Sequence, residues 1–199
     1  MALSMNQVTS VTAPGVSFEV DPKVYGRKLE VRYRLKNQRK RTLLVFNVLW
    51  DEDPTGNAVP SSSPFYACVR DPASLHLAQQ ILPLPQSKRL EVRIVPFVTR
   101  VEPGAIMEKS FALTLPIEEY SPYFPVSDET TTKLITTKVL FVTLEFIEEL
   151  DGMELTEAPI EGALHAYHTE MLAKIETTQS SPIKLELAVK KRLDEFERF

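Results

Sequence analysis

The chain has 199 residues, of which 43% are hydrophobic and 25% are charged. These are the proportions of an ordinary globular protein, so the sequence predicts one domain over residues 1–199, of which 1–13 are expected to be flexible. Glycine is scarce, with 6 residues, whereas proline is frequent, with 15. Six scattered glycines exclude a glycine-rich phosphate loop, and frequent prolines favour a fold with many strand ends and turns.

The formal net charge of −4 conceals an uneven distribution of charge along the chain. Residues 27–41 hold eight bases and one acid, whereas residues 145–161 hold seven acids and no base. If these stretches form opposite poles of the molecule, two copies meet basic pole to acidic pole, and we expect self-association that weakens as salt rises. The alternative is that both stretches are solvated surfaces.

Cysteine usage and the lack of long apolar segments restrict the class of protein. Cys68 is the only cysteine, which excludes an internal disulfide and a site built from several thiolates. It lies in the apolar run 65–69, so we expect a buried, unreactive thiol. No stretch approaches roughly 18 consecutive apolar residues, and residues 1–17 lack the features of a secretory signal. The expected location is therefore the cytoplasm, or the periplasm or cell exterior if a signal peptide has been removed.

In chain order, the first clear element is an alternating segment at residues 29–36. Its apolar residues share one parity, and its charged residues, which include Arg32 and Arg34, share the other. This pattern predicts a half-buried antiparallel strand with a basic outer face. The apolar run 42–50 follows a turn and predicts a central strand covered on both faces.

Alternation and β-rich composition predict further strands along the rest of the chain. The Asp151-Gly152 dipeptide predicts a type I′ hairpin with a return strand at 153–156. Residues 160–175 fit both a helical repeat and a strand alternation, so they form either one short helix or another strand. The other predicted strands cover residues 65–69, 90–101, 111–115, 136–147 and 183–189. Together these elements predict an all-β fold, an antiparallel immunoglobulin-like β-sandwich of about eight strands.

Two segments resemble parts of bacterial immunoglobulin-like or fibronectin-III-like domains. The segment Leu29-Glu-Val-Arg-Tyr-Arg-Leu-Lys-Asn37, with Leu43-Leu-Val-Phe46 after a short turn, resembles their first inner hairpin. Val101-Glu-Pro-Gly104, followed by Phe111-Ala-Leu-Thr-Leu115, is similar to their mid-domain turn and strand. The resemblance covers about residues 14–150 and implies a role in adhesion, assembly or recognition, without assigning a functional residue. The Cys…Trp…Cys core of antibody domains is missing, because the chain has a single cysteine.

A Pro-rich aromatic loop is the preferred candidate for a binding surface. Its rings, Tyr120, Tyr123 and Phe124, lie on backbone that prolines stiffen, so they offer contact area at a modest cost in entropy. The alternative is that these rings cap one end of the sandwich. Arg32 and Arg34 are the other candidate binding residues, because they project from the basic outer face.

Few residue pairs have a spacing that suits metal binding or catalysis. His165 and His168 share one face only if 160–175 is helical, and in that case they are weak candidates for metal ligands. On a strand they are surface histidines. The adjacent carboxylates Glu118 and Glu119 serve glycoside chemistry only where a cleft holds them, and otherwise they end a solvated strand.

These observations favour a non-enzymatic module that binds another protein or its own copies, and we expect no catalytic residue, metal or cofactor. The alternative is a β-sandwich that binds a small molecule or a carbohydrate, and the third choice is an enzyme. No nucleic-acid partner is expected, because Tyr33 lies on the inner parity and leaves the basic strand without a stacking platform. No membrane span is expected either.

Overall fold

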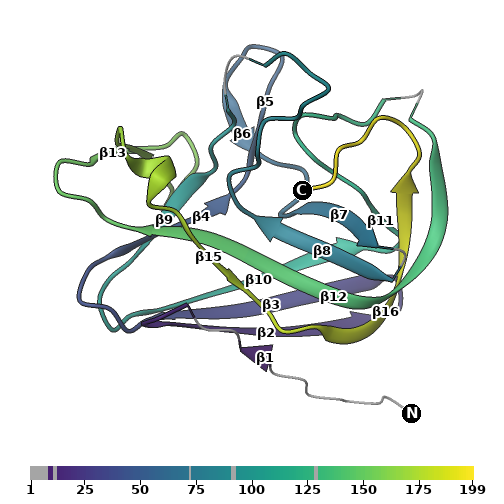
Figure 1. The fold of residues 1–199 in the computed structure, drawn as a ribbon, viewed down its shortest axis with the longest axis horizontal. Coiled ribbons are helices and arrows are strands. Elements are labelled where there is room, and N and C mark those ends of the chain that lie inside the picture. Colours follow the sequence, from purple (N-terminus) through teal and green to yellow (C-terminus); the bar gives the residue numbers. More distant parts are fainter. Residues whose placement is uncertain (1–8, 11–12, 72, 91–92, 128–129) are drawn as a thin grey trace.

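The computed structural model describes residues 9–10, 13–71, 73–90, 93–127 and 130–199 (Figure 1). Within these residues the regular elements are sixteen strands and a single 3-10 turn, so the prediction of an all-β fold is confirmed. Most of the segment that we expected to be flexible, 1–13, lies outside the described residues.

A four-stranded antiparallel sheet forms one layer of the molecule, with the strand order β1-β2-β3-β10. Its strands are β1 (Thr9–Ser10), β2 (Val16–Tyr25), β3 (Lys28–Asn37) and β10 (Ile106–Thr114). The alternation predicted for 29–36 is confirmed, because every second residue of β3 from Leu29 to Leu35 is buried and the residues between them face outward.

A larger, mixed sheet of ten strands forms the second layer and is organised around the long strand β12 (Thr132–Glu148). One edge of β12 pairs with β16 and then β15, and the other edge pairs with β8 and then β4. The pairing between β12 and β8 is parallel, whereas the other three are antiparallel. The other nine strands are β4 (Leu43–Val48), β7 (Tyr66–Asp71), β8 (Ser74–Gln79), β9 (Phe97–Val101), β11 (Ile117–Glu118), β13 (Glu154–Glu157), β14 (Leu164–Tyr167), β15 (Glu176–Gln179) and β16 (Ile183–Arg192). A separate hairpin joins β5 (Trp50–Glu52) to β6 (Ala58–Pro60).

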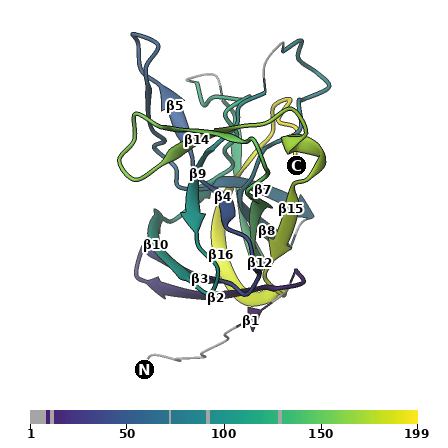
Figure 2. The same ribbon diagram turned by 90° about the vertical axis from the view of Figure 1, so that its left-hand side faces the viewer.

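The two layers enclose one main hydrophobic core, with the four-stranded sheet below the larger one in Figure 2. The buried side chains of β2, β3 and β10 pack there against those of β4, β7, β8, β12 and β16. A polar contact also joins the layers, because the Tyr33 hydroxyl donates to Gln79 Oε1 at 2.7 Å. Two smaller clusters flank the core, one beside β14 and one around Tyr66, Tyr123 and Phe196.

The turn after β12 differs from the prediction. Met153 N donates to Leu150 O at 3.1 Å, and Gly152 has a φ of 82°. A type I′ turn requires positive φ at both central residues, but in the described part of the chain only glycines have positive φ. The type I′ prediction is therefore wrong, and β13 pairs with β14 rather than returning along β12.

Residues 160–175 contain both kinds of structure that the sequence left open. Leu164–Tyr167 forms strand β14, and the helical part is reduced to the 3-10 turn Met171–Ala173. The strands described are more numerous than the expected eight, and β2, β8 and β15 are among those that were not predicted. The immunoglobulin-like arrangement itself stays a prediction.

Candidate interaction surface

The outer face of the four-stranded sheet carries rows of charged side chains that cross three strands. The strand register places Arg34 between Glu19 of β2 and Glu108 of β10, and it places Arg32 opposite Asp21 of β2. Directly opposed residues on one face of a sheet lie close enough to interact. The basic outer face predicted for β3 is present, but acids on its two neighbours balance it.

Ion pairs hold several of these side chains. Arg34 Nε donates to Glu108 Oε1 at 2.6 Å, and Arg32 Nη2 lies 3.4 Å from Glu30 Oε1. The arginine side chains remain 51% and 61% exposed, respectively. Exposed pairs of this kind contribute only about 0–1 kcal/mol each, so the face stays available to a partner at little cost.

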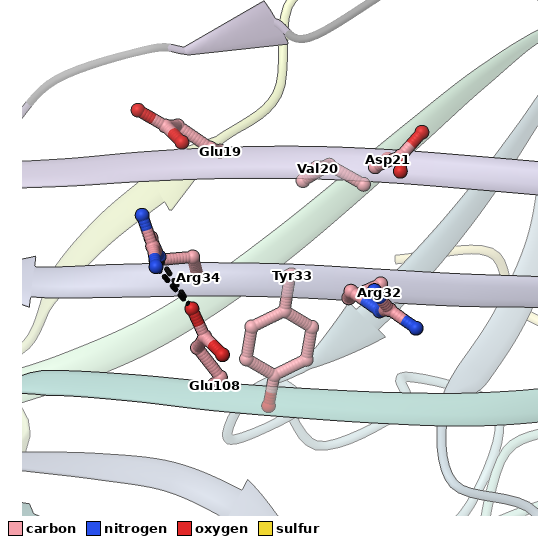
Figure 3. Close-up of a pocket in the computed structure, with 7 residues that line it drawn as sticks. All are labelled: Glu19, Val20, Asp21, Arg32, Tyr33, Arg34 and Glu108. Carbon is pink, nitrogen blue, oxygen red and sulfur yellow. Dashed lines mark hydrogen bonds and ion pairs between the residues drawn. The ribbon is translucent and has the colours of Figure 1, made fainter. Parts of the chain in front are cut away.

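These residues surround a shallow depression on the outer face (Figure 3). Its volume is about 170 Å³, which is below the usual range of small-molecule pockets, about 300–1,000 Å³. Figure 3 shows Arg34 joined to Glu108 across two strands, with Glu19 and Asp21 on the third. The depression therefore belongs to a charged surface and has the wrong size for a drug-sized ligand.

Strand β10 forms an open edge of this sheet, because its one sheet neighbour among the described residues is β3. Backbone bonds at both ends of the β3–β10 pair fix which residues face which way. Asn37 N donates to Ala105 O at 3.0 Å, and Leu115 N donates to Arg27 O at 2.9 Å. Antiparallel ladders alternate with period two, so the odd-numbered residues of β10 bond to β3.

The even-numbered residues of β10 consequently present their backbone N–H and C=O groups to the open edge. They are Ile106, Glu108, Ser110, Ala112 and Thr114, and all of them are exposed. Figure 2 shows β10 at the left-hand margin of the lower layer. We call this feature the β10 edge.

Two edges near the core, beside β7 and β16, are covered in part by contacts within the chain. Ala67 and Tyr120 exchange two backbone hydrogen bonds, of 3.0 and 2.8 Å, beside β7. The carboxylate of Glu119 accepts from Val69 N of β7 and from Arg192 N of β16, each at 2.7 Å. Arg198 completes the site with two hydrogen bonds to the same carboxylate, at 2.9 and 2.7 Å.

Glu119 is thus fully buried, which differs from the expectation of a solvated strand end. A buried carboxylate is tolerated when its oxygen atoms are hydrogen-bonded, and here four donors serve them. Its neighbour Glu118 lies 33% exposed and 3.6 Å from Lys190 Nζ. The two adjacent glutamates therefore occupy different environments and do not form a catalytic pair.

The basic and acidic stretches contact each other through two ion pairs. Arg39 Nη1 lies 3.2 Å from Glu148 Oε1, and Arg41 Nη2 lies 2.5 Å from Asp151 Oδ1. Arg39 also donates to both carboxylate oxygens of Glu176, at 2.5 and 2.7 Å. Two of the eight bases of 27–41 are thus paired with acids of 145–161 in the same molecule, whereas Arg32 and Arg34 pair with Glu30 and Glu108. The self-association expected from the charges stays a prediction.

The aromatic loop does not provide the exposed surface that the sequence suggested. Tyr123 and Phe124 are only 6% and 5% exposed, because they pack with Tyr66 and Phe196 in one of the flanking clusters. Tyr120 is half-buried and donates to Asp51 Oδ1 at 2.6 Å. Burial, reinforced by this carboxylate, raises the pKa of Tyr120 to about 12. The alternative, that these rings close one end of the sheets, describes them better.

The two candidate histidines do not meet at a common site. His165 lies on β14 with its ring 5.8 Å from that of Phe97, and His168 Nδ1 accepts from Glu170 N at 3.1 Å. In the described ranges no group of three or more His, Cys, Asp or Glu side chains is arranged to hold a metal ion.

Cys68 is fully buried, as expected, and burial raises the pKa of its thiol to about 11. The raised pKa keeps the group protonated at neutral pH. This supports the expectation of an unreactive thiol.

Sequence reasoning missed the β10 edge and the partner carboxylate Glu108. The signal was present, because the apolar parity of the strand begins at Met107, four residues before Phe111. The prediction began the strand at 111 and so left 106–110 out.

Comparisons with protein-family models, with curated proteins and with solved structures found no match to this chain. Among the described residues, no helix has the length and apolar character needed to cross a membrane.

Proposed function

We propose that this chain is a non-enzymatic interaction module that binds another polypeptide by adding a β-strand to the β10 edge. The observation that carries the proposal is the nine-residue strand β10, whose edge-facing backbone groups have no sheet neighbour among the described residues. Such an edge is a template for a further strand, in which main-chain hydrogen bonds give affinity and alternate side chains give specificity.

The side chains along β10 support selective rather than indiscriminate pairing. Glu108 places one acid on the outer face, and Lys109 places one base, half-exposed, on the inner parity. Inward-pointing charges on edge strands are a device that limits uncontrolled edge-to-edge association. A suitable partner strand therefore avoids a second base opposite Lys109 and a second acid opposite Glu108.

The sizes of the surface depressions favour a polypeptide over a small molecule. Three depressions on the surface of the described residues have volumes of about 170, 190 and 40 Å³. Drug-sized ligands usually occupy about 300–1,000 Å³. We retain binding of a small molecule or a carbohydrate as the weaker alternative.

The finer fold assignment is also a proposal. An immunoglobulin-like sandwich is supported by two mainly antiparallel sheets that enclose one core. The parallel pairing of β8 with β12 is the feature that departs most from that arrangement.

A peptide-binding experiment tests the proposed function. Peptides selected from a random phage-displayed library on the immobilised wild-type chain are labelled, and their affinities are measured by fluorescence anisotropy. The Ser110→Pro variant removes one edge-facing N–H without touching the bonds to β3, and Ser110→Ala is its matched control. We expect selected peptides to bind the wild-type chain and Ser110→Ala but to lose affinity for Ser110→Pro. Equal binding to all three contradicts the proposal.

A further inference from the structure

We infer that the strand added to the β10 edge is β10 of a second copy of this chain, paired antiparallel about a two-fold axis at Ser110. The inference rests on the proposed function and names its partner. It requires that β10 be complementary to itself in length, in the order of its side chains and in the direction of its backbone hydrogen bonds.

The register follows from the bounds of the strand. β10 runs from Ile106 to Thr114, so Ser110 is its midpoint. An antiparallel pair centred on Ser110 aligns all nine residues of one strand with all nine of the other. A shift of the centre to a neighbouring residue shortens the paired segment at both ends.

The charges favour the same register. With Ser110 at the centre, Glu108 faces Ala112 of the second copy and Lys109 faces Phe111. A centre at Lys109 sets two lysines against each other, and a centre at Glu108 sets two glutamates against each other. Like charges placed directly opposite one another destabilise a sheet, whereas a lysine beside an aromatic ring is favourable. The register that pairs the whole strand is therefore also one that opposes no like charges.

The backbone phase is compatible with this pairing. The backbone N–H and C=O of Ser110 face the open edge in both copies, so the two central residues can hydrogen-bond to each other. Five edge-facing residues on each strand then exchange about ten hydrogen bonds, which is the usual number for a protein–protein interface. The two four-stranded sheets would become one continuous sheet of eight strands, with the axis through its middle.

This association differs from the charge-driven one that the sequence suggested. Backbone hydrogen bonds contribute most of the contact, and the exposed ion pairs contribute little. The dimer should therefore persist at about 1 M salt, where the screening length falls to about 3 Å.

Site-specific cross-linking provides the main test. In the proposed register the two Ser110 Cα atoms lie about 5.5 Å apart, which is within the span of a disulfide. The two Ala112 Cα atoms lie four residues out of register, or about 13 Å apart, beyond that span. We expect Ser110→Cys to form a cross-linked dimer under mild oxidation, whereas Ala112→Cys and the wild-type chain, whose Cys68 is buried, remain uncross-linked. Cross-linking of Ala112→Cys to the same extent, or none in Ser110→Cys, overturns the inference.

Light scattering of the unmodified full chain supplies a second readout. We expect a dimer mass for the wild type and Ser110→Ala at low and high salt. Ser110→Pro should raise the dimer dissociation constant by about thirtyfold, because each dimer loses two hydrogen bonds. A wild-type chain that is monomeric at millimolar concentration overturns the inference, and so does a dimer that Ser110→Pro leaves intact.

The two proposals fail in different ways. If the wild type is monomeric and library peptides still bind it in a manner sensitive to Ser110→Pro, the second copy is the wrong occupant and strand addition stands. If peptide binding is also insensitive to Ser110→Pro, strand addition at this edge fails as well.

Discussion

The edges beside β7 and β16 are covered by another segment of the chain, whereas the β10 edge is open. Beside β7 and β16, the segment that contains Glu119 and Tyr120 supplies backbone bonds and a buried carboxylate, so these edges are sealed. Beside β10, no such segment is present among the described residues, and every edge-facing residue is exposed. The larger sheet is thus covered by the chain itself beside these two strands, whereas the smaller sheet leaves the whole length of β10 unpaired among the described residues.

Covering a strand edge with a buried carboxylate requires several hydrogen bonds to that carboxylate. Burying a carboxylate is costly unless its oxygen atoms are fully hydrogen-bonded, and at Glu119 two backbone N–H groups and Arg198 meet that need. An open edge needs none of this, but it exposes the chain to association. The contrast between the sealed edge and the β10 edge can be tested by substitutions on each side.

The largest expected effect is at the sealed edge. Glu119→Ala leaves the amides of Val69 and Arg192 without their acceptor, and it leaves the Arg198 guanidinium with the Arg192 carbonyl but without its carboxylate partner. Breaking a buried charge pair in this way costs about 3–5 kcal/mol. Urea unfolding measures the loss, and Glu118→Ala, in an exposed pair with Lys190, should cost less than about 1 kcal/mol. Similar losses in the two variants would contradict the assignment of Glu119 as the residue that seals these edges.

The next test concerns the two sides of β10. Lys109→Pro removes an N–H that bonds to β3, so we expect a loss of about 3 kcal/mol or more in the free energy of unfolding. Ser110→Pro removes only an edge-facing N–H, and its cost to the folded monomer should stay below about 1 kcal/mol. Thermal unfolding at low protein concentration separates the two variants. The opposite order of stability would mean that the odd-numbered residues face the open edge.

A pH measurement examines the interior beside the sealed edge. His76 on β8 is 8% exposed, and burial, followed by the charge of Arg70 and opposed by Asp71, lowers its pKa to about 4. The unfolded chain takes up this proton near pH 6.5, whereas the folded chain resists it until about pH 4. Stability from His76 is therefore fully present above pH 6.5 and is lost as the pH falls toward 4, by at most about 3 kcal/mol.

The variant His76→Gln isolates this contribution. Carboxyl groups such as Asp71, whose pKa is lowered by its hydrogen bonds to Ser74 and to the backbone, also make the chain less stable in acid. The informative quantity is therefore the difference between wild type and His76→Gln, measured by urea unfolding from pH 4 to pH 8. It should be constant above pH 6.5 and change below it. Parallel curves over the whole range would show that His76 titrates normally.

The sequence could predict the strands whose pattern is local. In β3 the two faces differ sharply, so the alternation identifies both the strand and its outward residues, Arg32 and Arg34. β2 was not predicted, and it contains Pro22, a residue type that usually argues against a strand. Here the proline is tolerated, because the nitrogen of Pro22 points away from β3 and toward the β1 edge of β2. On that edge β1 pairs only with Val20 and Glu19, so no hydrogen bond from residue 22 is needed.

The candidate site was less predictable, because it depends on pairings between distant residues. Glu118 and Glu119 are identical in type, and the difference between them comes from Arg198, which lies 79 residues further along the chain. The rings of Tyr123 and Phe124 have a composition that suits an exposed surface, but packing with Phe196 buries them. Whether a strand edge is open depends on which strands pair with it, and the local sequence pattern of a strand does not indicate its neighbours.

The smallest expected effect lies on the outer face of the open sheet. Arg34 makes an exposed pair with Glu108, whereas Arg39, only 13% exposed, bridges Glu148 and Glu176 and packs against the ring of Phe146. Arg39→Ala removes several bonds and packing, so we expect a loss of about 1–3 kcal/mol.

Arg34→Ala should cost no more than about 1 kcal/mol at low salt, because solvent already screens the pair. At about 1 M salt the screening length falls to about 3 Å, so the cost of Arg34→Ala should approach zero, while most of the cost of Arg39→Ala remains. Urea unfolding of both variants at low and high salt, at one low protein concentration, makes the comparison. If Arg34→Ala were as costly as Arg39→Ala and equally insensitive to salt, the charged face would be a structural element of the monomer. It would then be a poor candidate for a surface that is kept available for pairing.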